Sequence, residues 1–307
     1  MGPSYILRMQ APLPLIALFV GSSLTLSAQN LAGDMALSKI LPEPDPGWEL
    51  VAEGFQFTDG ACADAAGNFY FCDLGKSSGI LKLSPDGKLS TVTKVVPRIS
   101  GMKFAPDGRM IVADQGNPKR VVAIDLKTEA VEVLMEGTPP NDLAVSRGGH
   151  VYVTVTGAGE VLHIAGPGRT RTVATGIKAP NGIVLSPDGG TLGVSEYRGT
   201  NVWAFRVRQD GSLDAGDRYM TLRTSPTRED SGGDGATVDA EGRWYVTSHE
   251  GIQLFDETGR ISGVIARPQA KATVSIAFAG GGRRYLYACS SDRVYRRLTK
   301  TTGATGR

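Results

Sequence analysis

One short pattern recurs six times along this chain and constrains its fold more than any other feature. Each unit contains a run rich in Val, Ile, Tyr and Thr, a turn that includes Gly, and a second such run. The units occupy residues 59–73, 100–114, 141–155, 181–196, 234–248 and 275–289. Their first residues are 41, 41, 40, 53 and 41 positions apart. A β-sandwich would not keep this spacing so regular, so we interpret the units as repeats of one architecture.

A repeat of about 40 residues made only of strands predicts an all-β, six-bladed β-propeller with four-stranded blades. Strand-like runs between the units, such as 79–83 and 121–125, supply the remaining strands. The 40 glycines and 17 prolines among 307 residues are typical of a chain that turns often. A net charge of +2 without a basic run argues against nucleic acid as a partner.

The N-terminal region predicts export. Residues 1–33 contain no acid, and a mostly apolar run over 13–26 is followed by the small-residue site Ser27-Ala28-Gln29. We interpret 1–28 as a signal peptide of a periplasmic or secreted protein with no membrane span after cleavage; an uncleaved anchor is the alternative. An extended lead-in then covers 29–47, the propeller 48–298 and a disordered tail 299–307.

The first residue of each unit begins the innermost strand of its blade, so these residues meet around the central channel. They all carry side-chain oxygens: Asp59, Ser100, Asn141, Asn181, Asp234 and Ser275. The two carboxylates and two amides suit Ca²⁺, or less well Mg²⁺. The alternative for Asp or Asn before Gly is turn formation or strand capping. We expect the two serines to line the channel or contact substrate. The strand near 48–51 is expected to complete the last blade.

Four segments together resemble a known protein family. They read GFQFTDG, PPNDLAV, APNGIVLSPDG and GDGATVDAEGRWYVT. In this order, and over residues 48–296, the chain resembles the SMP-30/gluconolactonase/LRE-like proteins, which are six-bladed, calcium-dependent lactonases and esterases. The resemblance implies that one Ca²⁺ ion is held by four residues: Asp59, Asn141, Asn181 and Asp234.

The chain departs from the family pattern in two places. Members usually carry Glu followed by Gly-Pro where this chain has Asp59, whose side chain is one methylene shorter. Several sugar-lactone members place an Arg shortly before the first asparagine, where this chain has Pro139-Pro140. A small-molecule lactone or ester in general is therefore expected as substrate, rather than a sugar-acid lactone in particular.

The resemblance implies metal-assisted hydrolysis, with the ion polarising the substrate carbonyl. It also implies that Asp234 is the catalytic residue, either as a general base on water or as a nucleophile. Two alternatives stay open: a non-catalytic propeller that binds a ligand or partner around a structural ion, and a strictosidine-synthase-like propeller without a metal. We expect a monomer.

Several other residues are candidates for a role at the site. His249 could relay protons at the pocket mouth, or be an exposed loop residue. His150 and His163 are predicted to lie away from the site. The long fourth interval, with extra residues over 209–233, is either a lid or a plain surface insertion.

The three cysteines cannot form a closed disulfide framework. Cys62 and Cys72 lie on adjacent predicted strands, and export makes a disulfide between them conceivable. Buried free thiols are the expectation, with Cys289 in the core.

Overall fold

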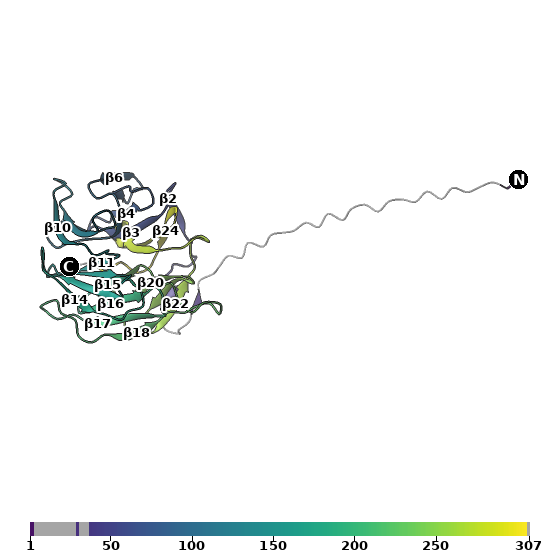
Figure 1. The fold of residues 1–307 in the computed structure, drawn as a ribbon. Coiled ribbons are helices and arrows are strands. Elements are labelled where there is room, and N and C mark those ends of the chain that lie inside the picture. Colours follow the sequence, from purple (N-terminus) through teal and green to yellow (C-terminus); the bar gives the residue numbers. More distant parts are fainter. Residues whose placement is uncertain (3–28, 31–36, 306–307) are drawn as a thin grey trace.

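The computed structural model describes residues 1–2, 29–30 and 37–305, and this part of the chain forms six antiparallel sheets. In Figure 1 the labelled strands follow one another around the molecule in sequence order, and the purple β2 lies in the same blade as the yellow β24. The six-bladed propeller is therefore confirmed. The predicted signal peptide falls on residues that, apart from the first two, lie outside the described ranges.

Each blade has four strands, given below from the channel outward, and the sheet of blade 5 gains a fifth strand at its outer edge. Blade 1 contains β3 (Thr58–Ala63), β4 (Phe69–Asp73), β5 (Ile80–Leu83) and β6 (Leu89–Thr93). Blade 2 contains β7 (Ile99–Phe104), β8 (Met110–Asp114), β9 (Arg120–Ile124) and β10 (Val131–Glu136). Blade 3 contains β11 (Leu143–Val145), β12 (Val151–Val155), β13 (Glu160–Ile164) and β14 (Thr170–Ala174).

The other three blades follow the same order. Blade 4 contains β15 (Pro180–Leu185), β16 (Thr191–Glu196), β17 (Asn201–Arg206) and β18 (Asp217–Thr221). Blade 5 contains β19 (Ala236–Val238), β20 (Trp244–Ser248), β21 (Gly251–Phe255) and β22 (Ile261–Ile265), and the short β1 (Gln29–Asn30) pairs with β22. Blade 6 contains β23 (Ser275–Ala279), β24 (Tyr285–Ser290), β25 (Arg293–Leu298) and β2 (Glu49–Glu53).

The ring is closed by β2, which comes before blade 1 in the sequence but pairs with β25 in blade 6. Leu50 is opposite Tyr295 in this ladder. The prediction that a strand near 48–51 completes the last blade is thus confirmed. Pairing the first strand with the last blade removes a free sheet edge.

The hydrophobic core consists of layers between neighbouring blades. Between blades 2 and 3, for example, Ile111 and Val121 pack with Val153 and Leu162. Equivalent clusters fill the other five seams. Successive side chains along a strand point to opposite faces of its blade, and each face packs against a neighbouring blade. Both faces of the middle strands are therefore apolar.

Two expectations about the ends of the propeller need correction. The lead-in is not simply extended, because it contains the 3₁₀ turn η1 (Leu37–Lys39), and Leu37, Ile40 and Leu41 are buried between blades 5 and 6.

A second 3₁₀ turn, η2 (Gly281–Arg283), lies in the β23–β24 connection.

The tail was predicted to be disordered, but residues 299–305 are ordered against the propeller. The Lys300 N–H donates to Ile40 O (2.7 Å), and Gly303 forms a β-bridge with Asp239. The hydroxyl of the buried Thr299 donates to Arg284 O (2.9 Å). Polar composition was misleading here, because hydroxyl groups that find backbone acceptors can be buried at little cost.

All three cysteines are buried and free, as expected. The Cys72 thiol donates to Ile99 O (2.8 Å) in the next blade. Burial raises the pKa of Cys62 to about 12, so this thiol stays protonated near neutral pH. No helix within the described ranges is long and apolar enough to cross a membrane.

Candidate functional site

The six repeat positions lie at one end of the channel, where each inner strand begins. Hydrogen bonds between neighbouring blades hold them in a ring. Ser100 Oγ donates to Asn141 O (2.5 Å), Thr154 Oγ1 to Asn181 O (2.8 Å), and Ser195 Oγ to Asp234 O (2.8 Å). In blades 3, 4 and 5, the backbone carbonyl of the repeat position thus accepts a hydrogen bond from a hydroxyl group of the preceding blade, as expected for equivalent positions.

The start of several inner strands is irregular. The register shifts between Asp59 and Cys62 in β3, between Ile99 and Gly101 in β7, and between Pro180 and Ile183 in β15. A bulge of this kind re-aims side chains that a regular pleat would point elsewhere. The irregularity coincides with the repeat positions Asp59, Ser100 and Asn181, of which Asp59 and Asn181 are candidate ligands.

The glycine after most of these positions is required by close packing between blades. A Cβ on Gly182 would lie 2.1 Å from Asp234 O, and one on Gly235 would lie 2.5 Å from Val274 O. No side chain can be accommodated at such distances from backbone atoms. The glycines of the Asp-Gly and Asn-Gly pairs are therefore needed for close contact between the inner strands of neighbouring blades. Turn formation alone does not explain them.

Asp142 is a third acid at this end of the channel, and sequence reasoning missed it. It stands in blade 3 where blades 1, 2, 4 and 5 have glycine. Its Oδ1 accepts from the Leu143 N–H (2.8 Å) and its Oδ2 from the Ile183 N–H of the next blade (3.3 Å). The signal was present in the repeat, as the single Asn-Asp among Asp-Gly, Ser-Gly and Asn-Gly pairs.

The three carboxyl groups influence one another electrostatically. Burial raises the pKa of Asp59 to about 7 despite a hydrogen bond from the Gly60 N–H, and the Asp142 carboxylate adds to the increase. Burial also raises the pKa of Asp234 well above its usual range, with further repulsion from Asp59 and Asp142. Confined carboxylates of like charge favour protonation or a bound cation.

Lys103 is the second residue that sequence reasoning missed. It lies on β7, three residues beyond Ser100, and its ammonium group donates to Ala61 O of blade 1 (3.1 Å). Burial raises the pKa of Asp142, whereas the positive charge of Lys103 opposes that rise. Lys103 belongs to no turn or motif in the sequence. Its role depends on the contact between blades 1 and 2, which the sequence pattern does not show.

The donor set fits a hard divalent cation. The carboxyl groups of Asp59, Asp142 and Asp234 interact electrostatically, and Asn141 and Asn181 stand at the equivalent starts of blades 3 and 4. Among the described residues, the amide side chains of Asn141 and Asn181 have no hydrogen-bond partner. Oxygen donors of this type suit Ca²⁺ better than zinc or copper. In the described ranges, no three acidic, His or Cys side chains form a metal site by themselves. An ion at this end of the channel would therefore also need amide oxygens or water as ligands.

The predicted serine hydroxyls are used by the scaffold. Besides its bond to Asn141, Ser100 Oγ accepts from Gln115 Nε2 (3.2 Å). Ser275 Oγ accepts from the Ala61 N–H (2.8 Å), which connects blade 6 to blade 1. These contacts give both serines a role in positioning the ring.

His249 lies at the rim beside the end of the long insertion. Its Nε2 is 3.2 Å from Asp230 Oδ1, and its ring meets the Tyr197 ring edge-to-face at a centroid distance of 6.2 Å. Ser231 Oγ donates to Gly199 O (2.9 Å), so the insertion is attached to blade 4. His249 is thus a partly buried, paired residue, and 230–233 form part of the rim next to Asp234.

The other two histidines lie elsewhere, as predicted. His163 Nε2 and His150 Nδ1 are 3.0 Å apart in blade 3, next to the Gly211 turn. Burial lowers the pKa of His163 to about 4, with added repulsion from His150 and Arg171.

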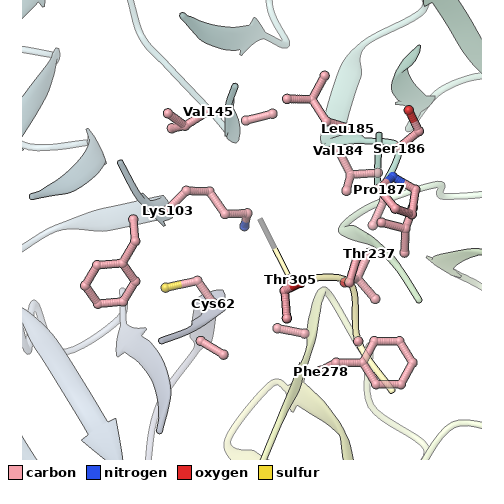
Figure 2. A pocket seen from close by; sticks show the side chains of 18 of the residues that line it. Cys62, Lys103, Val145, Val184, Leu185, Ser186, Pro187, Thr237, Phe278 and Thr305 are labelled. Atoms are coloured by element: carbon pink, nitrogen blue, oxygen red, sulfur yellow. The ribbon is translucent and has the colours of Figure 1, made fainter. Parts of the chain in front are cut away.

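Two hollows adjoin the inner strands. A cleft of about 620 Å³ between blades 3 and 4 opens on the same end as the acids and includes Asn181 among its lining residues. A cavity of about 250 Å³ lies at the other end of the channel, lined by Val145, Phe278 and Thr305 among others. Figure 2 shows the Lys103 side chain reaching from the wall into the middle of this cavity.

These features define a six-bladed propeller whose channel has one oxygen-rich, acidic end. The profile of the SMP-30/gluconolactonase/LRE-like region matches residues 57–292. The chain belongs to this family, and the resemblance found in the sequence is confirmed.

Two curated relatives are similar over much of the chain. One is a gluconolactonase of Zymomonas mobilis, 25% identical, with 94% of this chain and 95% of that protein covered. The other is a pentonolactonase of Haloferax volcanii, 27% identical over 62% of this chain and 66% of that protein.

Solved structures share the fold. A gluconolactonase from Xanthomonas campestris superposes with a TM-score of 0.75 at 19% identity, covering 89% of this chain and 94% of that one. A calcium-binding regucalcin from Agrobacterium tumefaciens gives a TM-score of 0.69 at 17% identity, covering 86% and 98%. At these identities the likeness concerns the fold alone.

Proposed function

We propose that the protein is a Ca²⁺-dependent hydrolase of lactones or related esters and that it acts at the acidic end of the channel. One observation carries the proposal: in a member of this family, the carboxyl groups of Asp59, Asp142 and Asp234, from three blades, raise one another's pKa at one end of the channel, where Asn141 and Asn181 also begin their blades. The names of the curated relatives, both lactonases, support the reaction class. The calcium-binding regucalcin neighbour supports the choice of metal.

A bound divalent cation would supply Lewis-acid polarisation of the substrate carbonyl. Asp59, Asp142, Asn141 and Asn181 would hold the ion. Asp234, which the resemblance also implies as a ligand, would accept a proton from the attacking water. Burial raises its pKa and favours the protonated form, so the positive charge of the ion would be needed to keep this base ionised. Thr154 and Ser195 fix the backbones of Asn181 and Asp234 through their hydroxyl groups.

The test is hydrolysis of a panel of five- and six-membered lactones by the purified chain, followed in a pH-stat with Ca²⁺ and then with EDTA. We expect turnover that chelation abolishes and Ca²⁺ restores. Turnover that ignores EDTA would exclude the metal-dependent mechanism. No turnover, combined with thermal stabilisation by Ca²⁺, would favour the non-catalytic propeller with a structural ion.

The two roles of Asp234 are separable by isotope labelling. In a single turnover in H₂¹⁸O with excess enzyme, a general base leaves all label in the product acid. If Asp234 instead attacks the lactone carbonyl and water then opens the mixed anhydride at the Asp234 carboxyl carbon, that same turnover places ¹⁸O in Asp234 and the product acid leaves unlabelled, which peptide and product mass spectrometry detect.

We also propose export, on the basis of the apolar run and small-residue site before Gln29. N-terminal sequencing of protein from a host that processes signal peptides should begin at or near Gln29. An intact N-terminus in the membrane fraction would favour the uncleaved anchor.

A further inference from the structure

The cleft between blades 3 and 4 adjoins the candidate site. Its walls come from loop 156–159, from segment 177–181 leading into β15, and from Tyr197 and Arg198 after β16. Asn181 belongs both to this cleft and to the candidate metal ligands. A molecule whose reacting carbonyl lies at the carboxylates can therefore extend into the cleft.

The walls of the cleft are held together by hydrogen bonds between loops. Thr156 Oγ1 donates to Pro180 O (2.7 Å), and the Ile177 N–H donates to Gly159 O (3.3 Å). Across the opposite wall, the Arg198 N–H donates to Lys178 O (3.2 Å). The cleft is thus preformed, as small-molecule sites generally are.

Two cationic side chains line this cleft, those of Lys178 and Arg198. Among the described residues, neither side chain forms a salt bridge. Both belong to short segments that face each other through their backbones, so both charges border one hollow.

Glu196, the acid nearest to Arg198 in the sequence, forms hydrogen bonds with other side chains. Glu196 is almost fully buried, with 1% of its surface exposed. Its Oε1 accepts from Trp203 Nε1 (2.8 Å) and its Oε2 from Asn201 Nδ2 (3.1 Å). A Cβ on Gly199 would lie only 2.0 Å from Oε2, which shows how closely the backbone covers this carboxylate. Glu196 therefore does not neutralise either cation, and the exposed side chains of Lys178 and Arg198 are accessible to a ligand in the cleft.

We propose that this cleft binds an anionic group of the substrate, so that the preferred lactones carry a carboxylate or a phosphate away from the ring carbonyl. The inference rests on the proposed lactonase function and names its substrate class. The anionic group of the substrate would lie over Lys178 and Arg198. It would thus lie away from the channel carboxylates, which would repel it. Hydrogen bonds between ionised groups of this kind are roughly twice as strong as neutral ones.

Steady-state kinetics of the Ca²⁺-loaded chain on three probes tests the proposal. The probes are neutral glucono-1,5-lactone, the carboxylate glucaro-1,4-lactone and the phosphate 6-phosphoglucono-1,5-lactone. The double variant Lys178→Gln/Arg198→Gln should raise KM for the preferred anionic probe about tenfold or more and leave the neutral probe within about twofold. The probe with the lower KM identifies the anionic group.

Arg147→Gln is the matched control, because Arg147 lines the cavity at the other end of the channel. It should change none of the three KM values. Equal KM values for neutral and anionic probes in the parent chain, unchanged in the double variant, would overturn the inference while leaving lactonase activity established.

A binding measurement keeps the two proposals distinguishable. Calorimetric titration with the open-chain dianion glucarate and with 6-phosphogluconate requires no turnover. Binding of either that disappears in the double variant supports the cleft even if no lactone is hydrolysed, in which case the proposed function fails. No binding of either anion, together with hydrolysis of the neutral probe alone, excludes the cleft as an anion site.

Discussion

The two ends of the central channel are built from the same six inner strands yet have opposite character. Where these strands begin, Asp59, Asp142 and Asp234 form an acidic end. Where they finish, apolar side chains such as Phe278 and basic ones such as Arg147 line a cavity together with residues 303–305 of the C-terminal segment. A repeated backbone thus supplies equivalent positions, and the side chains at each level decide the chemistry.

Lys103 connects the two ends. Its side chain lies in the cavity at the far end, and its charge acts on the carboxyl groups of Asp59 and Asp142 at the other end. The acidic end therefore carries three negative charges when ionised, partly balanced by one positive charge from within the channel. A divalent ion would neutralise the remainder.

The strongest test of the acidic end is Asp234→Asn. This change keeps the shape of the side chain but removes its basicity, so hydrolysis should fall by about 10²–10⁴-fold while the fold is kept. Lactone turnover and the thermal midpoint Tm measure the two effects. Asp86→Asn, at an exposed turn, is the control. Near-normal turnover in Asp234→Asn would remove this residue from the mechanism.

Asp142→Asn tests whether the acid that replaces the repeat glycine belongs to the ion site. Removing one of three negative charges should weaken Ca²⁺ binding about tenfold or more, as measured by calorimetry. Asp107→Asn, an exposed acid in a turn of blade 2, should leave the affinity unchanged. If Asp142→Asn also leaves it unchanged, Asp142 acts only through its backbone hydrogen bonds.

At the far end, Gly303→Ala should destabilise the fold without affecting the chemistry. A Cβ there would lie 2.1 Å from Phe278 Cβ, so the C-terminal segment must move, at a cost of about 1–3 kcal/mol. Gly281→Ala is the matched control, because nothing lies within 4 Å of its added Cβ. Denaturant unfolding measures the difference, and a large loss of turnover in folded Gly303→Ala would contradict the separation of the two ends.

Lys103→Met tests the electrostatic link between the ends. Without the ammonium charge, Ca²⁺ affinity should rise about tenfold, the size expected for a unit charge several ångströms away in a partly shielded site. Lys103→Arg, which keeps the charge, should stay close to the parent chain. Calorimetry measures both, and an unchanged affinity in Lys103→Met would show that the two ends are electrostatically independent.

The smallest effect concerns a region outside the channel. Because burial holds the pKa of His163 at about 4, below its ordinary value of 6.5, the native state favours neutral His163. The stability contributed by this residue is present above pH 6.5 and is lost as the pH falls towards 4. The Tm difference between the parent chain and His163→Gln should therefore shrink from pH 7 to pH 4.5. A constant difference would show that His163 does not titrate in this range.

Much of the fold was predictable because the signals are local. Alternating strands and glycine-containing turns predicted the number of blades, and the unpaired run near 48–51 predicted how the ring closes. The positions of Asp59, Asn141, Asn181 and Asp234 followed from their phase in the repeat. The rest was not visible in the pattern: Asp142 breaks the repeat, and Lys103 occupies a strand position where a side chain can face a neighbour or the channel.

The amino-acid sequence by itself determined the architecture of this protein and the ring of oxygen-bearing residues, since both depend on short-range periodicity that every blade repeats. Only the tertiary structure decided the charge of the channel, the order of the C-terminal segment and the cleft beside Asn181. These features depend on contacts between residues of different blades, far apart in the chain. No local pattern encodes such contacts, because each arises only when two blades pack together.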